Sequence, residues 1–228
     1  MSSNNDEWKN LTFAQRVGAE PLPTQLKPTE LSDGLRSGLW AIVYHYIATS
    51  LGGEVYLTGK WNDILYRKHV YFDKGMANEF VDHWMTAAGR LSGLFKQGSY
   101  TQVYGCLEFF LRDSDCPLDF SESLNDVLKS NLAPYTIIDG NTITPIASHE
   151  QGLLLAHALD QLSKSPMVGA SQHLKQAIEF LNKGQWAKSI TESIRAVESV
   201  ARKIEPSANT LDPALKNLAP KIGMHSAM

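Results

Sequence analysis

The segment from Trp186 to Glu205, WAKSITESIRAVESVARKIE, carries the strongest periodic pattern in the chain. Its apolar side chains recur at three- and four-residue steps, the period of an amphipathic α-helix with one buried stripe. The stripe comprises Trp186, Ile190, Ile194, Val197, Val200, Ala201 and Ile204. Pro206 ends the helix, because proline lacks the amide hydrogen and its ring clashes with the preceding turn. The segment therefore predicts a long helix that packs by one face.

A row of alternating charges lies between these apolar residues. Glu192, Arg195, Glu198 and Arg202 follow one another at three- and four-residue steps, so opposite charges meet on one face of the helix. If the row is a solvated surface, each pair stabilises the helix by roughly 0.2–0.5 kcal/mol. The alternative is a partly buried polar seam used in dimerisation or in RNA chemistry. The four residues are our candidate site, with both interpretations open.

The same helix resembles a known family. SITESIRAVESVARKI, preceded by HLKQAIEFLNKGQW and followed by TLDPALKNL, is similar to the C-terminal domain of bacterial AbiJ-type abortive-infection proteins. That domain belongs to the HEPN superfamily of small helical bundles, many of which are metal-independent ribonucleases. The resemblance implies a phage-defence function, a helical bundle, a homodimer and RNA as a partner.

Three further segments resemble the N-terminal domain of AbiJ-type proteins. FAQRVG at 13–18 matches an F-x-x-R-x-G opening, and LRSGLW at 35–40 matches the L-R-x-x-L-W phrase of the first helix. Residues 135–146 alternate β-branched side chains around Asp139-Gly140, a strong hairpin signal, at the position where the family has a hairpin. Arg36 is interpreted as a surface or boundary arginine rather than a functional one.

Helical periodicity continues through most of the chain. The pattern predicts a helix capped by Ser32, four helices between Gly59 and Pro134, and one from His149 to Leu162. The second of the four is expected to include residues 76–88. The expected fold is thus mainly α, with two packed helical units and one β-hairpin near 135–146.

Three ranges describe the expected domains. Residues 12–162 form an AbiJ-like N-terminal helical domain that includes the hairpin. Residues 163–172, SKSPMVGASQ, are rich in small residues and proline and form the linker. Residues 173–228 form the HEPN-like helical domain.

Composition limits the environment and the partners. The chain is 43% hydrophobic and 20% charged, as in ordinary globular proteins. With no run of eighteen apolar residues and no apolar leader, we expect a cytoplasmic protein that does not enter a membrane. The net charge of −3 argues against a strongly basic nucleic-acid binder. Residues 171–228, however, carry 8 Lys and Arg against 5 Asp and Glu, so this part has the charge that RNA attracts.

Metal and cofactor motifs are missing from the sequence. None of the seven histidines forms HxH, HxxxH or HExxH, and Cys106 and Cys116 lack a CxxC partner. The glycine-rich phosphate loops and the GxSxG nucleophile motif are also missing. We therefore expect no metal, no cofactor and two reduced thiols.

The HEPN ribonuclease signature is an arginine followed, after four to six residues, by a histidine. Such a pair orients a ribose 2′-hydroxyl, moves protons and stabilises the charged phosphorane without a metal. No arginine in this chain has a histidine at that spacing. In AbiJ-type relatives the domain continues beyond the point where this sequence ends, so we expect an incomplete bundle with no catalytic residue.

Two functions of different classes remain. The first is a HEPN-type phage-defence effector or its catalytically incomplete relative, with residues 12–162 as sensor or regulator. The second is a non-catalytic helical module that docks RNA or a protein. If a catalytic pair exists despite its spacing, the first candidates are His173 and His225 beside Arg195 and Arg202.

Overall fold

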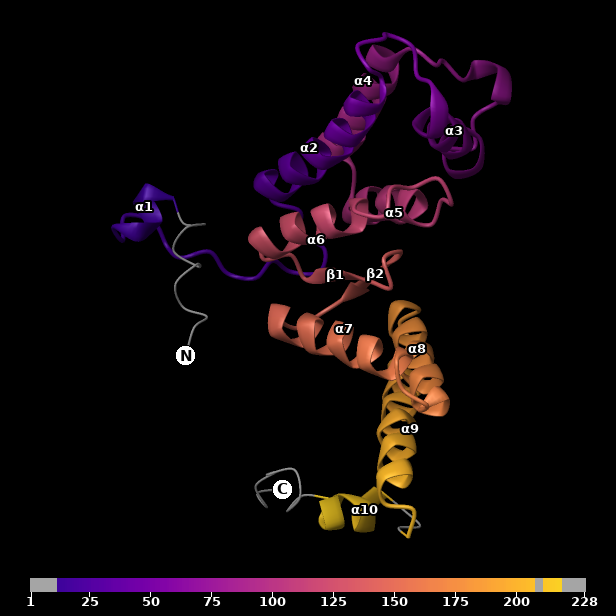
Figure 1. Cartoon of the computed structure of the whole chain (residues 1–228). Helices are drawn as coiled ribbons and strands as arrows, with labels where there is room; N and C mark the ends of the chain where they lie inside the picture. Colours follow the sequence, from indigo (N-terminus) through magenta and orange to yellow (C-terminus); the bar gives the residue numbers. More distant parts are fainter. Residues whose placement is uncertain (1–11, 208–210, 219–228) are drawn as a thin grey trace. The chain divides into compact units, whose positions relative to one another are not determined.

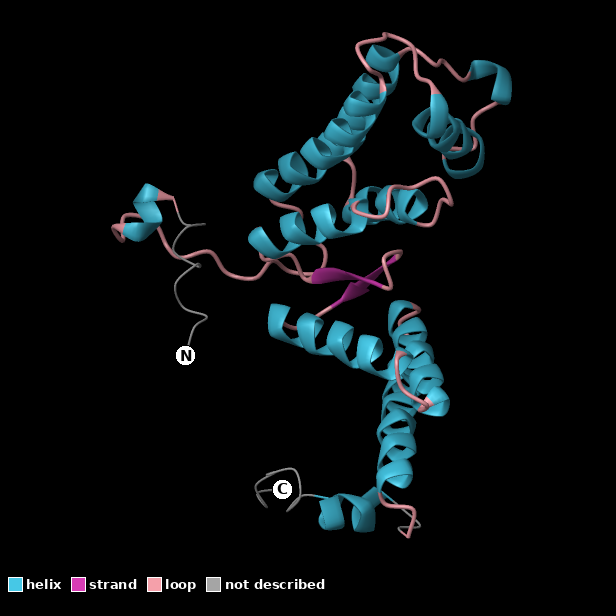
Figure 2. Ribbon diagram, viewed as in Figure 1, coloured by secondary structure: helices cyan, strands magenta, loops and turns pink. Residues whose placement is uncertain are grey.

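The computed structural model describes residues 12–207 and 211–218, which fall into two compact units, one within residues 1–149 and one within 150–228. Figure 1 follows the elements along the chain, and Figure 2 separates helices from strands. In the described residues the fold is mainly helical with a single two-stranded sheet, as predicted.

The first unit contains most of the helices and both strands. Its elements are α1 (Phe13–Arg16), α2 (Asp33–Ser50), α3 (Gly59–Arg67), the π-helical turn η2 (Lys68–Phe72), the 3₁₀ turn η3 (Ala77–Glu79), α4 (Trp84–Gln97), α5 (Tyr100–Leu111), α6 (Phe120–Ser130), β1 (Tyr135–Ile138) and β2 (Thr142–Pro145).

Helix α2 begins where the sequence predicts. The side-chain oxygen of Ser32 accepts a hydrogen bond from the backbone N–H of Leu35 at 3.2 Å, which satisfies one of the free amides of the first turn. Its buried face repeats every four residues, through Leu35, Leu39, Val43 and Ile47, all fully buried. This face contacts α4 and α6. Each such side chain stabilises the fold by about 1.5–3 kcal/mol relative to an exposed one.

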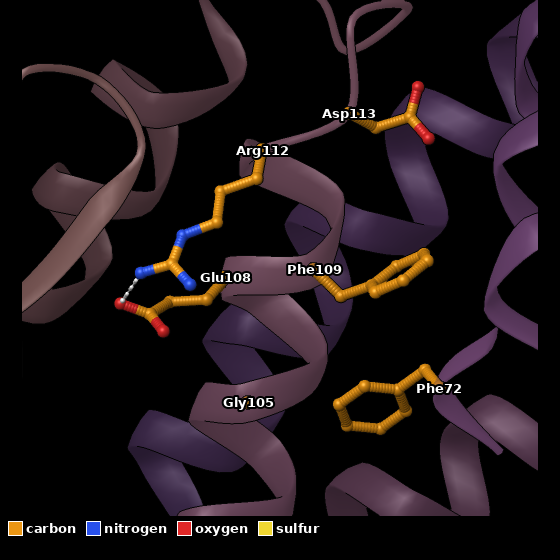
Figure 3. A pocket seen from close by; sticks show the side chains of 6 residues that line it. All are labelled: Phe72, Gly105, Glu108, Phe109, Arg112 and Asp113. Atoms are coloured by element: carbon orange, nitrogen blue, oxygen red, sulfur yellow. Dashed lines mark ion pairs between the residues drawn. The ribbon is translucent and has the colours of Figure 1, made fainter.

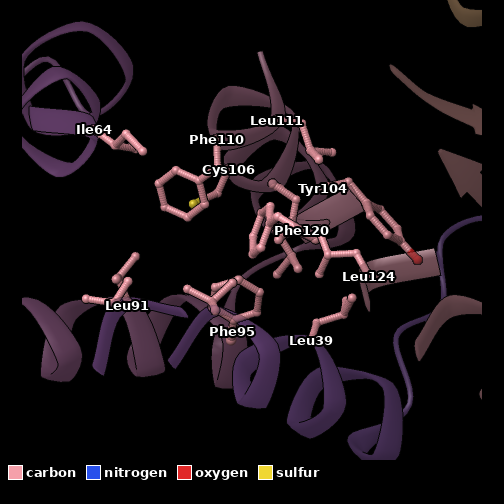
Figure 4. Packing of buried hydrophobic residues seen from close by; sticks show 14 of the residues in the cluster. Leu39, Ile64, Leu91, Phe95, Tyr104, Cys106, Phe110, Leu111, Phe120 and Leu124 are labelled. Carbon is pink, nitrogen blue, oxygen red and sulfur yellow. The ribbon is translucent and has the colours of Figure 1, made fainter. Parts of the chain in front are cut away.

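Aromatic rings fill the centre of this unit. The ring of Trp61 meets the rings of Phe110 and Phe120 edge-on, with ring centres 5.7 Å apart in both pairs. Phe95, on α4, is also fully buried, and Figure 4 shows it among aliphatic side chains from α2 and α4. Edge-to-face contacts of this kind favour one arrangement of the helices over others.

The second of the four expected helices begins later than predicted. Residues 76–83 are not α-helical, and α4 starts at Trp84. The N–H of Trp84 donates to the carbonyl of Val55 at 2.8 Å, and the N–H of Leu57 donates to the carbonyl of Asp82. These backbone bonds hold residues 82–84 in an extended pairing with 55–57, which prevents helix formation there. The helix also extends beyond the expected residues 76–88, as far as Gln97.

The predicted hairpin is confirmed. Tyr135 pairs with Pro145 and Ile138 with Thr142, and the turn lies at Asp139-Gly140. Asp139, Gly140 and Asn141 separate the last paired residues, and the N–H of Asn141 donates to the carbonyl of Ile138 at 3.2 Å. Asp139 and Gly140 have positive φ, 51° and 72°, which aspartate and glycine adopt more readily than most residues.

The second unit consists of α7 (His149–Ser163), α8 (Val168–Asn182), α9 (Trp186–Ile204) and α10 (Leu211–Leu218). The predicted linker is helical from Val168 onward. Helices α8 and α9 form an antiparallel pair, joined at Gly184, whose φ of 67° suits glycine. The two compact units divide after His149, the first residue of α7, and the domain boundary at Leu162 stays a prediction.

Candidate functional site

Helix α9 turns small and polar residues, rather than large apolar ones, toward α8. The residues buried along its length are Ser189, Glu192, Ala196 and Ala201. The hydroxyl of Ser189 donates to the backbone carbonyl of Ala177 on α8 at 2.8 Å. Small side chains at this contact allow the two helix backbones to approach closely.

Glu192 joins the two helices at this contact. One carboxylate oxygen, Oε2, lies 2.6 Å from Nδ1 of His173 on α8, and the other, Oε1, accepts from the Arg195 guanidinium at 2.7 Å. Only 9% of the Glu192 side chain is exposed, against 32% of His173 and 55% of Arg195. A largely buried carboxylate thus binds an imidazole and a guanidinium that both reach solvent.

The charge state of Glu192 fixes the histidine tautomer. The hydrogen bond from His173 lowers the pKa of Glu192, and the charge of Arg195 adds to this against the opposing effect of burial. An ionised carboxylate only accepts hydrogen bonds, so Nδ1 of His173 is the donor. Nε2 is then a proton acceptor in the neutral ring and a donor in the charged ring. In the charged ring, Nε2 and the Arg195 guanidinium both offer N–H donors to an anion.

The four predicted site residues do not form one continuous seam. Glu192 and Arg195 lie in the cluster with His173, whereas Glu198 and Arg202 form a separate pair at 4.0 Å. The Arg202 side chain is 60% exposed, which is typical of a solvated surface pair. The functional role of these residues stays a prediction, and His225 lies outside the described residues.

His173 is the member of the cluster that the candidate row did not include. It lies 19 positions before Glu192, on another helix. A periodicity within one helix cannot reveal a partner on a second helix. The useful signal was the glycine at 184, because a tight antiparallel turn there brings residues around 173 opposite residues around 192.

The apolar stripe predicted to be buried on α9 is largely exposed, and this part of the prediction is wrong. The exposed fractions are 61% for Trp186, 62% for Ile190, 47% for Ile194, 49% for Val197 and 53% for Ile204. Ala201, by contrast, is buried and packs with Ala214 of α10. The helix contacts α8 through its small residues instead, where Ser189 and Glu192 find hydrogen-bond partners. We call the five exposed residues the outer face of α9.

Arg36 holds together the start of α2 and the end of α4. Its guanidinium donates to the carbonyls of Leu31 at 3.2 Å and of Phe95 and Gly98 at 2.8 Å each. The last carbonyls of a helix have no partner within the helix, so a charged donor there stabilises its end. A structural role accounts for the contacts of this arginine.

Metal and membrane sites have no support in the described chain. Within residues 12–207 and 211–218, no three His, Cys, Asp or Glu side chains gather closely enough to hold a metal ion. No described helix has both the length and the apolar composition needed to cross a membrane.

Comparison with known proteins finds a family match that covers the first unit from residue 11 onward and most of α7. A family model described as AbiJ N-terminal domain 4 matches residues 11–161, which is more than half of the 228 residues. The matched range includes the hairpin and excludes α8, α9 and α10. No curated protein and no solved structure matches the chain.

Proposed function

The chain belongs to the AbiJ N-terminal domain 4 family, and from this we propose that it is an abortive-infection protein that protects a bacterial population against phage. In this proposal residues 12–162 act as sensor or regulator, and residues 173–228 act as the responding unit, in the cytoplasm. The family match over residues 11–161 is the observation that carries the proposal.

The responding unit is proposed to be a relative of HEPN ribonucleases that docks RNA without cleaving it. The resemblance of SITESIRAVESVARKI to HEPN domains supports the relationship. His173 and Arg195 support the docking, because both bind the carboxylate of Glu192 and both reach solvent, in a part of the chain with surplus positive charge. The sequence contains no arginine and histidine at the spacing of HEPN ribonucleases, so we do not expect cleavage.

This unit is further proposed to work as a homodimer joined through the outer face of α9. Five large apolar side chains, each about half exposed, lie on one face of the helix, four of them between Trp186 and Val197 and the fifth at Ile204. Water-soluble proteins rarely expose such a patch unless it is an interface. A two-fold axis lets the same patch on two copies cover itself, which makes a second copy the simplest occupant.

The outer face of α9 also favours a second candidate function, a helical interaction module that docks another protein. The two functions differ in what binds the chain: RNA and a second copy in the first, a different protein in the second. Light scattering and RNA titration of the purified chain separate them.

Infection of bacteria that produce the chain tests the defence function. We expect fewer plaques than with an empty vector, together with death of the infected cells when phage outnumber bacteria, because abortive infection sacrifices the infected cell. The variant Ile190→Glu/Ile194→Glu should lose this protection, while Thr191→Glu, which adds a charge beside the same face, should keep it. Unchanged plaque numbers with the wild-type chain against a broad set of phages would refute the proposal.

RNA docking is tested by fluorescence anisotropy with labelled single-stranded RNA and transfer RNA in chelator. Arg195→Gln should weaken binding, and intact RNA should be recovered after incubation. Cleavage that resists chelator and co-purifies with the chain would show that it is itself a ribonuclease.

A further inference from the structure

The first unit contains a pocket of about 380 Å³ that the proposed function does not use. It lies between the turn η2 and helix α5 and is lined by Phe72, Gly105, Glu108, Phe109, Arg112 and Asp113 (Figure 3). Its volume is within the range of sites for small molecules, about 300–1,000 Å³.

One wall of the pocket is apolar. The half-buried rings of Phe72 and Phe109 lie 5.6 Å apart between their centres, at 56° to each other. Gly105 has no side chain, so the surface of α5 beside these rings is uncovered. A Cβ at this position would lie 3.5 Å from Phe72, an ordinary contact, so packing does not force a glycine here. The wall therefore offers ring faces and open space to an apolar group.

The rim of the pocket presents a negative and a positive charge next to each other. A nitrogen of Arg112 lies 3.1 Å from Oε1 of Glu108. In Figure 3 this pair lies on one side of α5 and the two rings lie on the other, with Gly105 between them. The Arg112 side chain is 56% exposed, and a guanidinium has five N–H donors, so most of its donors remain available to a ligand.

Two further contacts fix the rim in place. Oε1 of Glu108 also accepts the backbone N–H of Ile143 on β2 at 2.9 Å. Both oxygens of Asp113 accept from Arg67 at 2.7 Å, and this guanidinium also reaches Asp115. A rim held in this way loses little conformational freedom when a ligand binds.

We propose that this pocket binds a small zwitterion with a large apolar side chain, the chemistry of a free aromatic α-amino acid. The ammonium group pairs with Glu108, the carboxylate pairs with Arg112, and the side chain contacts Phe72, Gly105 and Phe109. Adjacent opposite charges on the rim match adjacent opposite charges on the ligand.

The surrounding charges favour a zwitterion over a phosphate. Four carboxylates, Asp73, Glu108, Asp113 and Asp115, stand against three cations, Arg67, Arg112 and Lys68, whose ammonium lies 5.4 Å from the centre of the Phe72 ring. A doubly charged phosphate would meet a net negative site, whereas a zwitterion adds no net charge. The inference concerns the first unit alone and is independent of the proposed defence function.

Calorimetric titration of the full chain with a matched set of probes tests this site. L-tryptophan and L-phenylalanine should bind. Glycine lacks the apolar side chain, tryptamine lacks the carboxylate and N-acetyl-L-tryptophan lacks the ammonium group, so each should bind at least about tenfold more weakly. Adenosine monophosphate should bind more weakly than L-tryptophan.

Variants separate the pocket from other surfaces. Arg112→Gln, an exposed change that should leave the fold intact, should weaken L-tryptophan binding about tenfold or more. Phe109→Ala should weaken it as well, whereas Arg90→Gln, an exposed arginine on α4, should leave it unchanged. The proposal is overturned if neither aromatic amino acid binds at millimolar concentration, if N-acetyl-L-tryptophan or adenosine monophosphate binds as tightly as L-tryptophan, or if Arg112→Gln has no effect.

Discussion

Glu192 of α9 and His173 of α8 lie 2.6 Å apart, and the same carboxylate accepts from Arg195, so one largely buried acid ties two helices together. A histidine of α8 and an arginine of α9 are thus held at the same carboxylate, although they lie on different helices. The tie also makes the stability of the helix pair depend on the ionisation of Glu192.

Acidification should weaken this tie. The partners of Glu192 lower its pKa below the ordinary value of 4.5, so the folded state binds fewer protons at this group than the unfolded state. Its stabilising contribution is therefore present above about pH 4.5 and is lost as the pH falls through the lower folded value. Carboxylates titrate at about pH 3 to 6. Over this range the free energy of unfolding, measured with a chemical denaturant, should depend less steeply on pH in Glu192→Gln than in the wild type. Glu179→Gln, which removes an exposed pair with Lys183, is the control and should retain the wild-type slope.

Asn125 should prove important for the hairpin. Its side chain accepts the N–H of Ile137 at 2.8 Å and donates to the carbonyl of the same residue at 3.2 Å. Asn125→Ala leaves both groups without these partners and should lower the free energy of unfolding by about 1–3 kcal/mol. Ser130→Ala, at an exposed position of the same helix, should change it by less than about 0.5 kcal/mol. Equal effects of the two changes in urea unfolding would contradict this role.

Two helical glycines should respond in opposite directions to alanine. A Cβ on Gly38 of α2 would lie 2.7 Å from a methyl carbon of Val127 on α6, so Gly38→Ala forces these helices apart and should destabilise the fold. A Cβ on Gly105 meets only ordinary contacts, so Gly105→Ala should gain up to about 1 kcal/mol from helix propensity. Thermal unfolding of both variants measures the difference. A stabilising Gly38→Ala would show that α2 and α6 are not packed so closely.

Local patterns predicted the elements of the fold, while contacts between elements decided what was missed. The Ser32 cap and the Asp139-Gly140 turn depend on a few neighbouring residues, and both form as expected. The start of α4 depends on backbone hydrogen bonds with residues 55–57, which are separated from it in the sequence by α3, η2 and η3. No periodicity within 76–88 reveals these bonds.

The candidate site shows the same division. Periodicity identified α9 and its charged row, and it placed Glu192 and Arg195 one turn apart. It could not tell which face meets α8, because that choice depends on the small residues of the other helix, among them Ala170 and Ala177. An apolar stripe normally faces the core, so the rule placed Ile190 and Ile194 inside, whereas they lie outside.

The outer face of α9 is the surface on which the proposed pairing of the chain depends, and multi-angle light scattering of the full chain measures that pairing without assumptions about RNA or phage. We expect a mass near twice the chain mass of 25.3 kDa, falling toward one chain on dilution. Ile190→Glu/Ile194→Glu should remain a monomer at all concentrations, because two carboxylates per copy would be buried unpaired, while Thr191→Glu should still dimerise. A wild-type chain that stays monomeric at high concentration, or a double variant with unchanged mass, would contradict the pairing through α9.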